Sequence, residues 1–180
     1  MWRVHRHIGM GGDQIVAAVA GDDVERRHGD ELREASREEF KPLRQECAPL
    51  PGARGLIEEL KRRDARVVLA SSSNQDDLDY FLSLLGVREL VDGWTTKDDV
   101  ERSKPHPDVV QAALEKAGSR DAVMVGDSRW DIEAAANAGL PTVCVITGGW
   151  SKQELRDHGA VAVFESLAAL RESLDSTPLR

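Results

Sequence analysis

The first residues that could do chemistry form a run of hydroxyl side chains. The apolar stretch that ends at Ala70 is followed directly by Ser71 and Ser72. A strand-to-helix turn of this kind offers backbone N–H groups and hydroxyl donors, which suit a phosphate or a carboxylate. The alternative is a serine-rich helix cap that holds no ligand, and the segment taken alone favours that alternative.

A pair of aspartates follows a second apolar stretch. Gly126 ends that stretch, Asp127 comes next, and Asp131 lies one helical turn further along the chain. We expect the two carboxylates to lie close together, because residues four positions apart share one face of a helix. Oxygen ligands of this type suit Mg²⁺. The alternative is a helix-capping Asp127 followed by a surface Asp131.

A lysine held by prolines is the third candidate. Lys104 is followed by Pro105 and Pro107, which stiffen the loop and restrict the position of the ammonium group. A fixed cation close to a carboxylate pair and a hydroxyl turn could neutralise a phosphoryl group. An ordinary surface lysine in a loop is the competing interpretation.

Strands and helices must position these candidate residues, and the pattern of apolar residues predicts where those strands and helices lie. Residues 1–48 show helical patterns and no strand pattern, whereas from residue 49 short apolar stretches alternate with amphipathic helices. This alternation predicts parallel βαβ units and an α/β sheet. Strands are expected at 66–70, 122–126 and 141–146, the first two of them buried, with shorter extended pieces at 95–96 and 160–163.

Composition excludes several classes of protein. The 180 residues include 24 basic and 32 acidic side chains, a net charge of −8, which argues against nucleic acid or an anionic membrane as the main partner. The apolar stretches are too short to cross a bilayer. Cys47 and Cys144 show no CxxC spacing, and we interpret them as reduced thiols of a cytoplasmic protein.

The order of the three segments is more specific than any one of them. Leu69-Ala-Ser71, then Lys104-Pro-His-Pro107, then Gly126-Asp127-Ser128 with Asp131 resembles the haloacid dehalogenase-like hydrolase superfamily. Within it, the sequence is most similar to the phosphoglycolate phosphatase and β-phosphoglucomutase-like group. The resemblance implies a Rossmann-like core over residues 49–180 and a small helical cap, incomplete at its start, over residues 1–48.

The resemblance also implies roles for the candidate residues. Ser71 would hydrogen-bond the transferring phosphoryl group beside the Ser72 amide, and Lys104 would balance charge on the nucleophile and the phosphate. Asp127 would ligate Mg²⁺, and Asp131 would support Lys104 or the metal. The implied activity is Mg²⁺-dependent hydrolysis of a small phosphorylated metabolite through an aspartyl-phosphate, by a monomer or homodimer.

The sequence departs from the family in one respect. The family's first motif, an apolar strand ending in Asp-x-Asp-Gly-Thr, supplies the nucleophile and the acid/base, and the sequence contains no such segment. About 25 to 35 residues would hold that strand, its turn and a cap helix. The corresponding gap would be at the centre of the sheet, leaving two strands with unpaired backbone groups.

We therefore expect a phosphatase shortened at its N-terminus, for example by a misplaced start codon, and inactive or nearly so as written. A non-catalytic module that binds phosphate or Mg²⁺ and is completed by another chain is the alternative. A receiver-like signalling domain is disfavoured because it has no helical cap.

Overall fold

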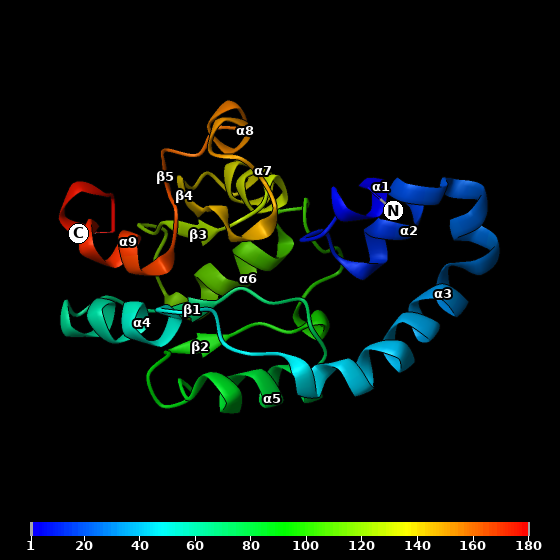
Figure 1. Cartoon of the computed structure of the whole chain (residues 1–180), viewed down its shortest axis with the longest axis horizontal. Coiled ribbons are helices and arrows are strands. Elements are labelled where there is room, and N and C mark those ends of the chain that lie inside the picture. The colour runs from blue at the N-terminus through cyan, green and yellow to red at the C-terminus, as the bar shows by residue number, and fades with distance from the viewer. Residues whose placement is uncertain (1, 180) are drawn as a thin grey trace.

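The strands of the core form two separate parallel sheets (Figure 1). In the computed structural model, which describes residues 2–179, β1 (Val68–Leu69) pairs with β2 (Gly93–Trp94). A second sheet has the order β3-β4-β5, formed by β3 (Met124–Gly126), β4 (Thr142–Val145) and β5 (Ala162–Phe164). No strand pairing joins β1 to β3 within the described residues. The expected α/β fold with parallel strands is therefore confirmed, with the strands divided between two sheets.

Helices cover both faces of the two sheets and hold them together. On one face, Leu56 and Leu60 share a hydrophobic cluster with Val143 and Leu170, and Val67, just before β1, packs against the same cluster. On the other face one helix contacts β1 and β2 and packs against a second that contacts β3 and β4. The helices of the described chain are α1 (Trp2–His5), α2 (Gly12–Ala20), α3 (Asp22–Leu43), α4 (Ala53–Arg62), α5 (Gln75–Leu85), α6 (Asp108–Ala117), α7 (Arg129–Asn137), α8 (Lys152–Asp157) and α9 (Leu167–Glu172). Of these, α4 and α9 lie on the first face, whereas α6 and α7 lie on the second.

The strands differ in burial, which corrects part of the prediction. All four residues of β4 are buried, whereas those of β1 and β3 are only half-buried. Buried strands over 66–70 and 122–126 were therefore the wrong expectation, since both strands are shorter and partly exposed. The reason is that β4 has a neighbour on each side, but β1 and β3 each have one side without a paired strand. The strand predicted at 141–146 is confirmed as β4.

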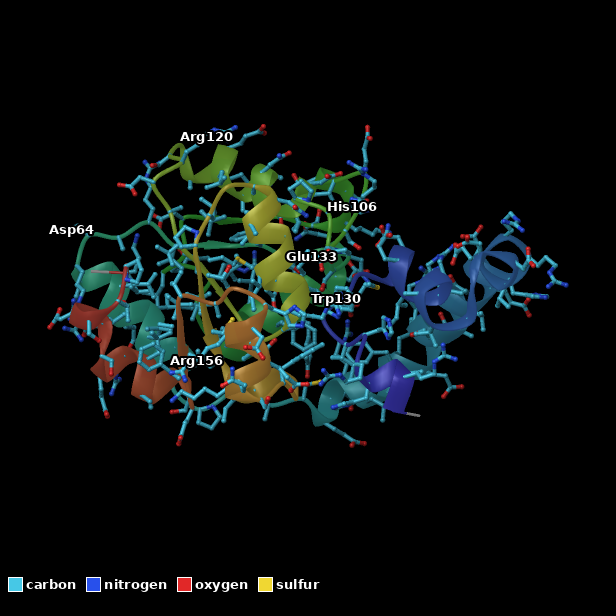
Figure 2. All side chains as sticks on the ribbon, turned by 90° about the horizontal axis from the view of Figure 1, so that it is seen from above. Asp64, His106, Arg120, Trp130, Glu133 and Arg156 are labelled. Carbon is cyan, nitrogen blue, oxygen red and sulfur yellow. The ribbon has the colours of Figure 1, made fainter. Side chains whose placement is uncertain are left out.

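The N-terminal region is helical, as predicted, over residues 2–48. It reaches the core through the segment between α1 and α2. The Arg6 guanidinium lies 3.6 Å from the centre of the Trp150 ring and pairs with Glu154 at 2.6 Å. His7 stacks on Trp130, whose ring lies at the end of α7 that faces this segment (Figure 2). The N-terminal segment is thus fixed beside the loops that follow β3 and β4.

Two further expectations can be compared with the structure. Neither Cys47 nor Cys144 forms a disulfide, as predicted. Burial raises the pKa of the Cys144 thiol to about 12. Across residues 2–179, no helix combines the length and the apolar character needed to cross a membrane.

Candidate active site

At the end of β3, the buried Asp131 forms an ion pair with the half-buried Lys104. Lys104 Nζ lies 2.8 Å from Asp131 Oδ1, and the two side chains are 17% and 7% exposed. The second carboxylate oxygen, Oδ2, accepts from the backbone amides of Asp127 and Ser128 and from the Ser128 hydroxyl, at 3.1, 3.1 and 2.7 Å. Burial alone would raise the pKa of the Asp131 carboxyl, but Lys104 and these hydrogen bonds outweigh it and lower that pKa.

Local sequence explains how Asp131 reaches this position. Ser128 caps α7 and exchanges hydrogen bonds with Asp131 in a capping box. Gly126 lets the carboxylate come close to the end of β3, because a Cβ at that position would lie 2.4 Å from the Asp131 Cβ. The resulting geometry fixes the ammonium of Lys104 through Asp131.

Asp127 occupies a different environment. The hydroxyl of Thr147 donates to Asp127 Oδ2 at 2.9 Å. Burial raises the pKa of the Asp127 carboxyl, the neighbouring Asp131 adds to that rise, and Thr147 and Lys104 oppose it. Gly148 allows the close approach, since a Cβ there would lie 2.3 Å from the Asp127 carbonyl oxygen. Sequence reasoning did not identify Thr147; the only signal was a hydroxyl directly after the apolar stretch that forms β4.

The serine turn belongs to the other sheet. Thr95, fully buried at the end of β2, donates to the Ser71 carbonyl at 2.7 Å and accepts from the Ser71 amide at 2.9 Å. The Ser71 hydroxyl accepts from the Ser73 amide at 3.1 Å, and Asn74 caps α5. Thr95 is the second functional residue, after Thr147, that sequence reasoning missed. The sequence placed it in an extended piece and assigned it no contact.

The structure brings some of the predicted residues together and leaves others apart. Lys104, Asp127 and Asp131 form one cluster, which we call the lysine cluster. In the described chain, neither Ser71 nor Ser72 hydrogen-bonds to this cluster.

The lysine cluster does not by itself make a complete Mg²⁺ site. Both Asp131 oxygens already accept hydrogen bonds, which leaves Asp127 as the carboxylate able to bind a cation. Over residues 2–179, no three His, Cys, Asp or Glu side chains are grouped so that they could hold a metal ion. Mg²⁺ prefers six oxygen ligands and commonly takes the remainder from water and substrate phosphates.

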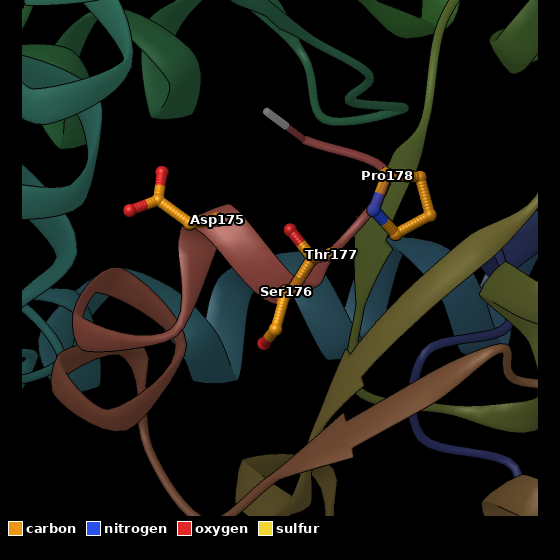
Figure 3. A pocket seen from close by; sticks show the side chains of 4 residues that line it. All are labelled: Asp175, Ser176, Thr177 and Pro178. Atoms are coloured by element: carbon orange, nitrogen blue, oxygen red, sulfur yellow. The ribbon is translucent and has the colours of Figure 1, made fainter.

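A hollow of about 360 Å³ lies near the C-terminus and is lined by Asp175, Ser176, Thr177 and Pro178 (Figure 3). It contains none of the predicted site residues. The C-terminal segment also lies at the opposite end of the molecule from α1 and α2 (Figure 1). The hollow is therefore separate from the lysine cluster.

Comparison with known proteins gives consistent relatives. The chain is 36% identical over 91 residues to a pyrophosphatase, PpaX, of Bacillus cereus strain AH820, covering 49% of this chain and 42% of that protein. It is 32% identical over 126 residues to the phosphoglycolate phosphatase of Rhodospirillum rubrum, covering 69% of this chain and 52% of the relative. The chain thus spans about half the length of these curated relatives.

The fold and a family model agree with these matches. A crystal structure of a hydrolase from Pseudomonas syringae superposes with a TM-score of 0.89 at 30% identity, covering 97% of this chain and 82% of that one. The model of the haloacid dehalogenase-like hydrolase family matches residues 2–145. The resemblance identified from the motifs is confirmed: this chain belongs to the haloacid dehalogenase-like hydrolase family.

Proposed function

We propose that the lysine cluster and the turn at Ser71 and Ser72 form the phosphate-positioning part of a Mg²⁺-dependent phosphatase for a small phosphorylated metabolite. The observation that carries the proposal is the lysine cluster, in which a buried carboxylate holds the Lys104 ammonium beside Asp127. Two of the relatives named above are a pyrophosphatase and a phosphoglycolate phosphatase, which supports a phosphoric ester or anhydride as the substrate class.

Each residue has a task that follows from its contacts. Lys104 would neutralise charge on the phosphoryl group, and Asp131 would keep the ammonium in place. The Ser71 hydroxyl and the Ser72 amide would bind phosphoryl oxygens. Asp127 would contribute one ligand to Mg²⁺, which supplies charge neutralisation when bound.

The described residues provide no evident nucleophile. Asp131 is committed to Lys104 and the backbone amides, and Asp127 is the carboxylate assigned above to the cation. We therefore propose that residues 1–180 alone bind phosphate but do not turn over substrate. A binding module without turnover, completed by another chain, is the second candidate, and the absence of any pairing between β1 and β3 in the described chain favours it.

The test separates binding from turnover. Phosphate release from an aryl phosphate, pyrophosphate and phosphoglycolate with Mg²⁺ should not exceed that of the Asp127→Ala variant. Binding of inorganic phosphate, measured by calorimetry, should weaken about tenfold when Lys104→Met removes a charge-assisted contact. Turnover that is lost in Asp127→Ala would refute the proposed inactivity, and phosphate binding unchanged in Lys104→Met would refute the site.

The remaining expectations stay proposals. We propose that the protein works in the cytoplasm as a monomer or homodimer, and that it binds neither nucleic acid nor membrane. The net charge of −8 supports the absence of nucleic acid and membrane as partners, and the two unpaired thiols support the cytoplasm. Light scattering coupled to gel filtration measures the oligomeric state.

A further inference from the structure

The loop that carries Lys104 is attached to the N-terminal helical region by one side chain. Asp13, in the first turn of α2, accepts from the Ser103 backbone amide at 3.0 Å and from the Ser103 hydroxyl. Ser103 is only 4% exposed and directly precedes Lys104 in the chain. Asp13 therefore connects α2 to a residue 90 positions further along the chain, next to Lys104.

A backbone contact reinforces this attachment. The Gly11 amide donates to the Lys104 carbonyl at 3.3 Å. Gly11 also lies against the Ser103 side chain, so that a Cβ at Gly11 would overlap the Ser103 hydroxyl. By contrast, nothing lies within 4 Å of the position that a Cβ on Gly12 would take. The start of α2 is thus packed closely against residues 103 and 104.

The charge of Asp13 strengthens the contact. Burial would raise the pKa of the Asp13 carboxyl, but the hydrogen bonds from Ser103 outweigh it and lower that pKa. Asp13 is therefore ionised at neutral pH, and hydrogen bonds to an ionised acceptor are about twice as strong as those between neutral groups. Replacing the carboxylate with an amide should loosen the loop while keeping the size of the side chain.

Lys104 is thereby held at both ends. Asp131 fixes the ammonium, with Nζ 2.8 Å from Oδ1, whereas Asp13 and Gly11 fix the backbone at the other end. The four-carbon stem of a lysine is flexible, so the position of its ammonium depends on where its backbone lies. Asp131 alone would allow the loop to shift while the ion pair persists. Asp13 removes that freedom by joining the loop to α2.

We propose that Asp13 is a positioning residue for Lys104. Through Ser103 it holds the loop where the Lys104 ammonium can meet both Asp131 and a bound phosphoryl group. The inference rests on the proposed function of the lysine cluster. It gives the N-terminal helical region a task in phosphate binding that requires no contact between Asp13 and the phosphate.

The first measurement follows the Lys104 ammonium directly, in the protein without phosphate. Lysine is labelled isotopically, and the NMR signal that is missing in Lys104→Met identifies this ammonium. Asp13→Asn should shift or broaden the signal, because the loop is no longer fixed to α2. Asp22→Asn is the matched control, since Asp22 also lies in the first turn of a helix, α3, but is exposed. It should leave the signal unchanged.

The second measurement is the affinity for inorganic phosphate, by calorimetry. Asp13→Asn should weaken binding about tenfold, whereas Asp22→Asn should not change it. Gly11→Ala should also weaken binding, because the new methyl group displaces the Ser103 side chain, whereas Gly12→Ala places its methyl group in open space and should have no effect. Circular dichroism checks that the variants fold. If Asp13→Asn does not fold, Gly11→Ala with its control Gly12→Ala decides the question by both measurements.

Ser103→Ala tests whether Asp13 acts through Ser103. In the Ser103→Ala background, one of the two hydrogen bonds to Asp13 is already lost. Asp13→Asn should therefore weaken phosphate binding by a smaller factor in that background than in the unmodified protein. The same factor in both backgrounds would overturn the proposed route.

The outcomes separate this inference from the proposed function. If Lys104→Met weakens phosphate binding but Asp13→Asn does not, the lysine cluster binds phosphate and the positioning role is wrong. If Lys104→Met leaves binding unchanged, the proposed function fails, and the ammonium signal alone decides whether Asp13 positions Lys104. A signal that Asp13→Asn leaves in place, or that Asp22→Asn moves equally, overturns the inference.

Discussion

The two sheets carry two differently built parts of the candidate site. At the three-stranded sheet, Asp131 is buried and both of its carboxylate oxygens are hydrogen-bonded, Oδ2 by groups that follow β3 and Oδ1 by Lys104 from the connection between β2 and α6. On the two-stranded sheet, the turn at Ser71 is attached mainly through one buried hydroxyl, that of Thr95. The difference teaches that the part that holds the Lys104 ammonium is complete within the described residues, whereas the position of the turn at Ser71, which we propose binds phosphate, depends on how the two sheets are held relative to each other.

The largest expected effect is in amide hydrogen exchange. Amides of β4, such as that of Cys144, are bonded and buried and should exchange only through substantial opening of the sheet, whereas those of Val68 and Val125 lack partners. We expect the latter to exchange about a thousandfold faster, as measured by exchange followed with NMR. Amides of the exposed helix α3 provide an internal reference. Equal protection of Val125 and Cys144 would contradict the contrast between the strands.

Removing Asp131 should have the next largest effect. Asp131→Ala leaves the Lys104 ammonium, 17% exposed, without its carboxylate, and breaking a buried pair costs about 3–5 kcal/mol. Glu133→Ala, on the same helix (Figure 2), removes a side chain that is 47% exposed and should change stability by less than about 0.5 kcal/mol. Urea unfolding measures both.

The pH dependence of the Asp131 effect has a defined sign. Its folded pKa is lowered below the ordinary 3.8, so its contribution is present above that value and is lost as pH falls through the folded pKa. A cost for Asp131→Ala that persists unchanged well below that range would show that packing, rather than charge, is the cause.

Substitutions at Thr95, which holds the turn at Ser71, should reduce stability less than Asp131→Ala does. Thr95→Val keeps the shape of the side chain but removes both hydrogen bonds to the Ser71 backbone, which leaves buried groups unsatisfied at a cost of about 1–3 kcal/mol. Thr95→Ser retains the hydroxyl and should therefore lose less stability than Thr95→Val. Thermal unfolding compares the two, and equal destabilisation would mean that the methyl group of Thr95 matters more than its hydroxyl.

Sequence reasoning predicted the general fold and the order of its elements because apolar periodicity is a local property. It also predicted that Asp127 and Asp131 lie close together, since helical spacing is local too, whereas the alternative of a helix-capping Asp127 and a surface Asp131 is wrong, because Ser128 caps α7 and Asp131 is buried. It did not predict the half-burial of β1 and β3, because the burial of a strand depends on which neighbours pair with it. Thr95 and Thr147 were missed for the same reason: each acts through a contact across strands that no local pattern encodes.

The smallest effect, with the opposite sign, is expected at Asp127. Its folded pKa is raised above the ordinary 3.8, chiefly by burial, so the ionised carboxylate destabilises the fold at neutral pH. Asp127→Asn should therefore raise the melting temperature, in contrast to Asp131→Ala.

The gain from Asp127→Asn should be complete above the folded pKa of Asp127 and should shrink as pH falls towards the ordinary value of 3.8, where the native carboxyl becomes protonated in both states. Thr147→Val provides the matched test, because it removes the hydroxyl that donates to the carboxylate at 2.9 Å and should lower the melting temperature. When Thr147→Val is combined with Asp127→Asn, it should lower the melting temperature by less, since an uncharged amide gains less from the hydroxyl than a carboxylate does. A melting temperature that falls in Asp127→Asn at neutral pH would mean that the carboxylate is stabilised where it lies, and that the cluster tolerates both of its aspartates as anions.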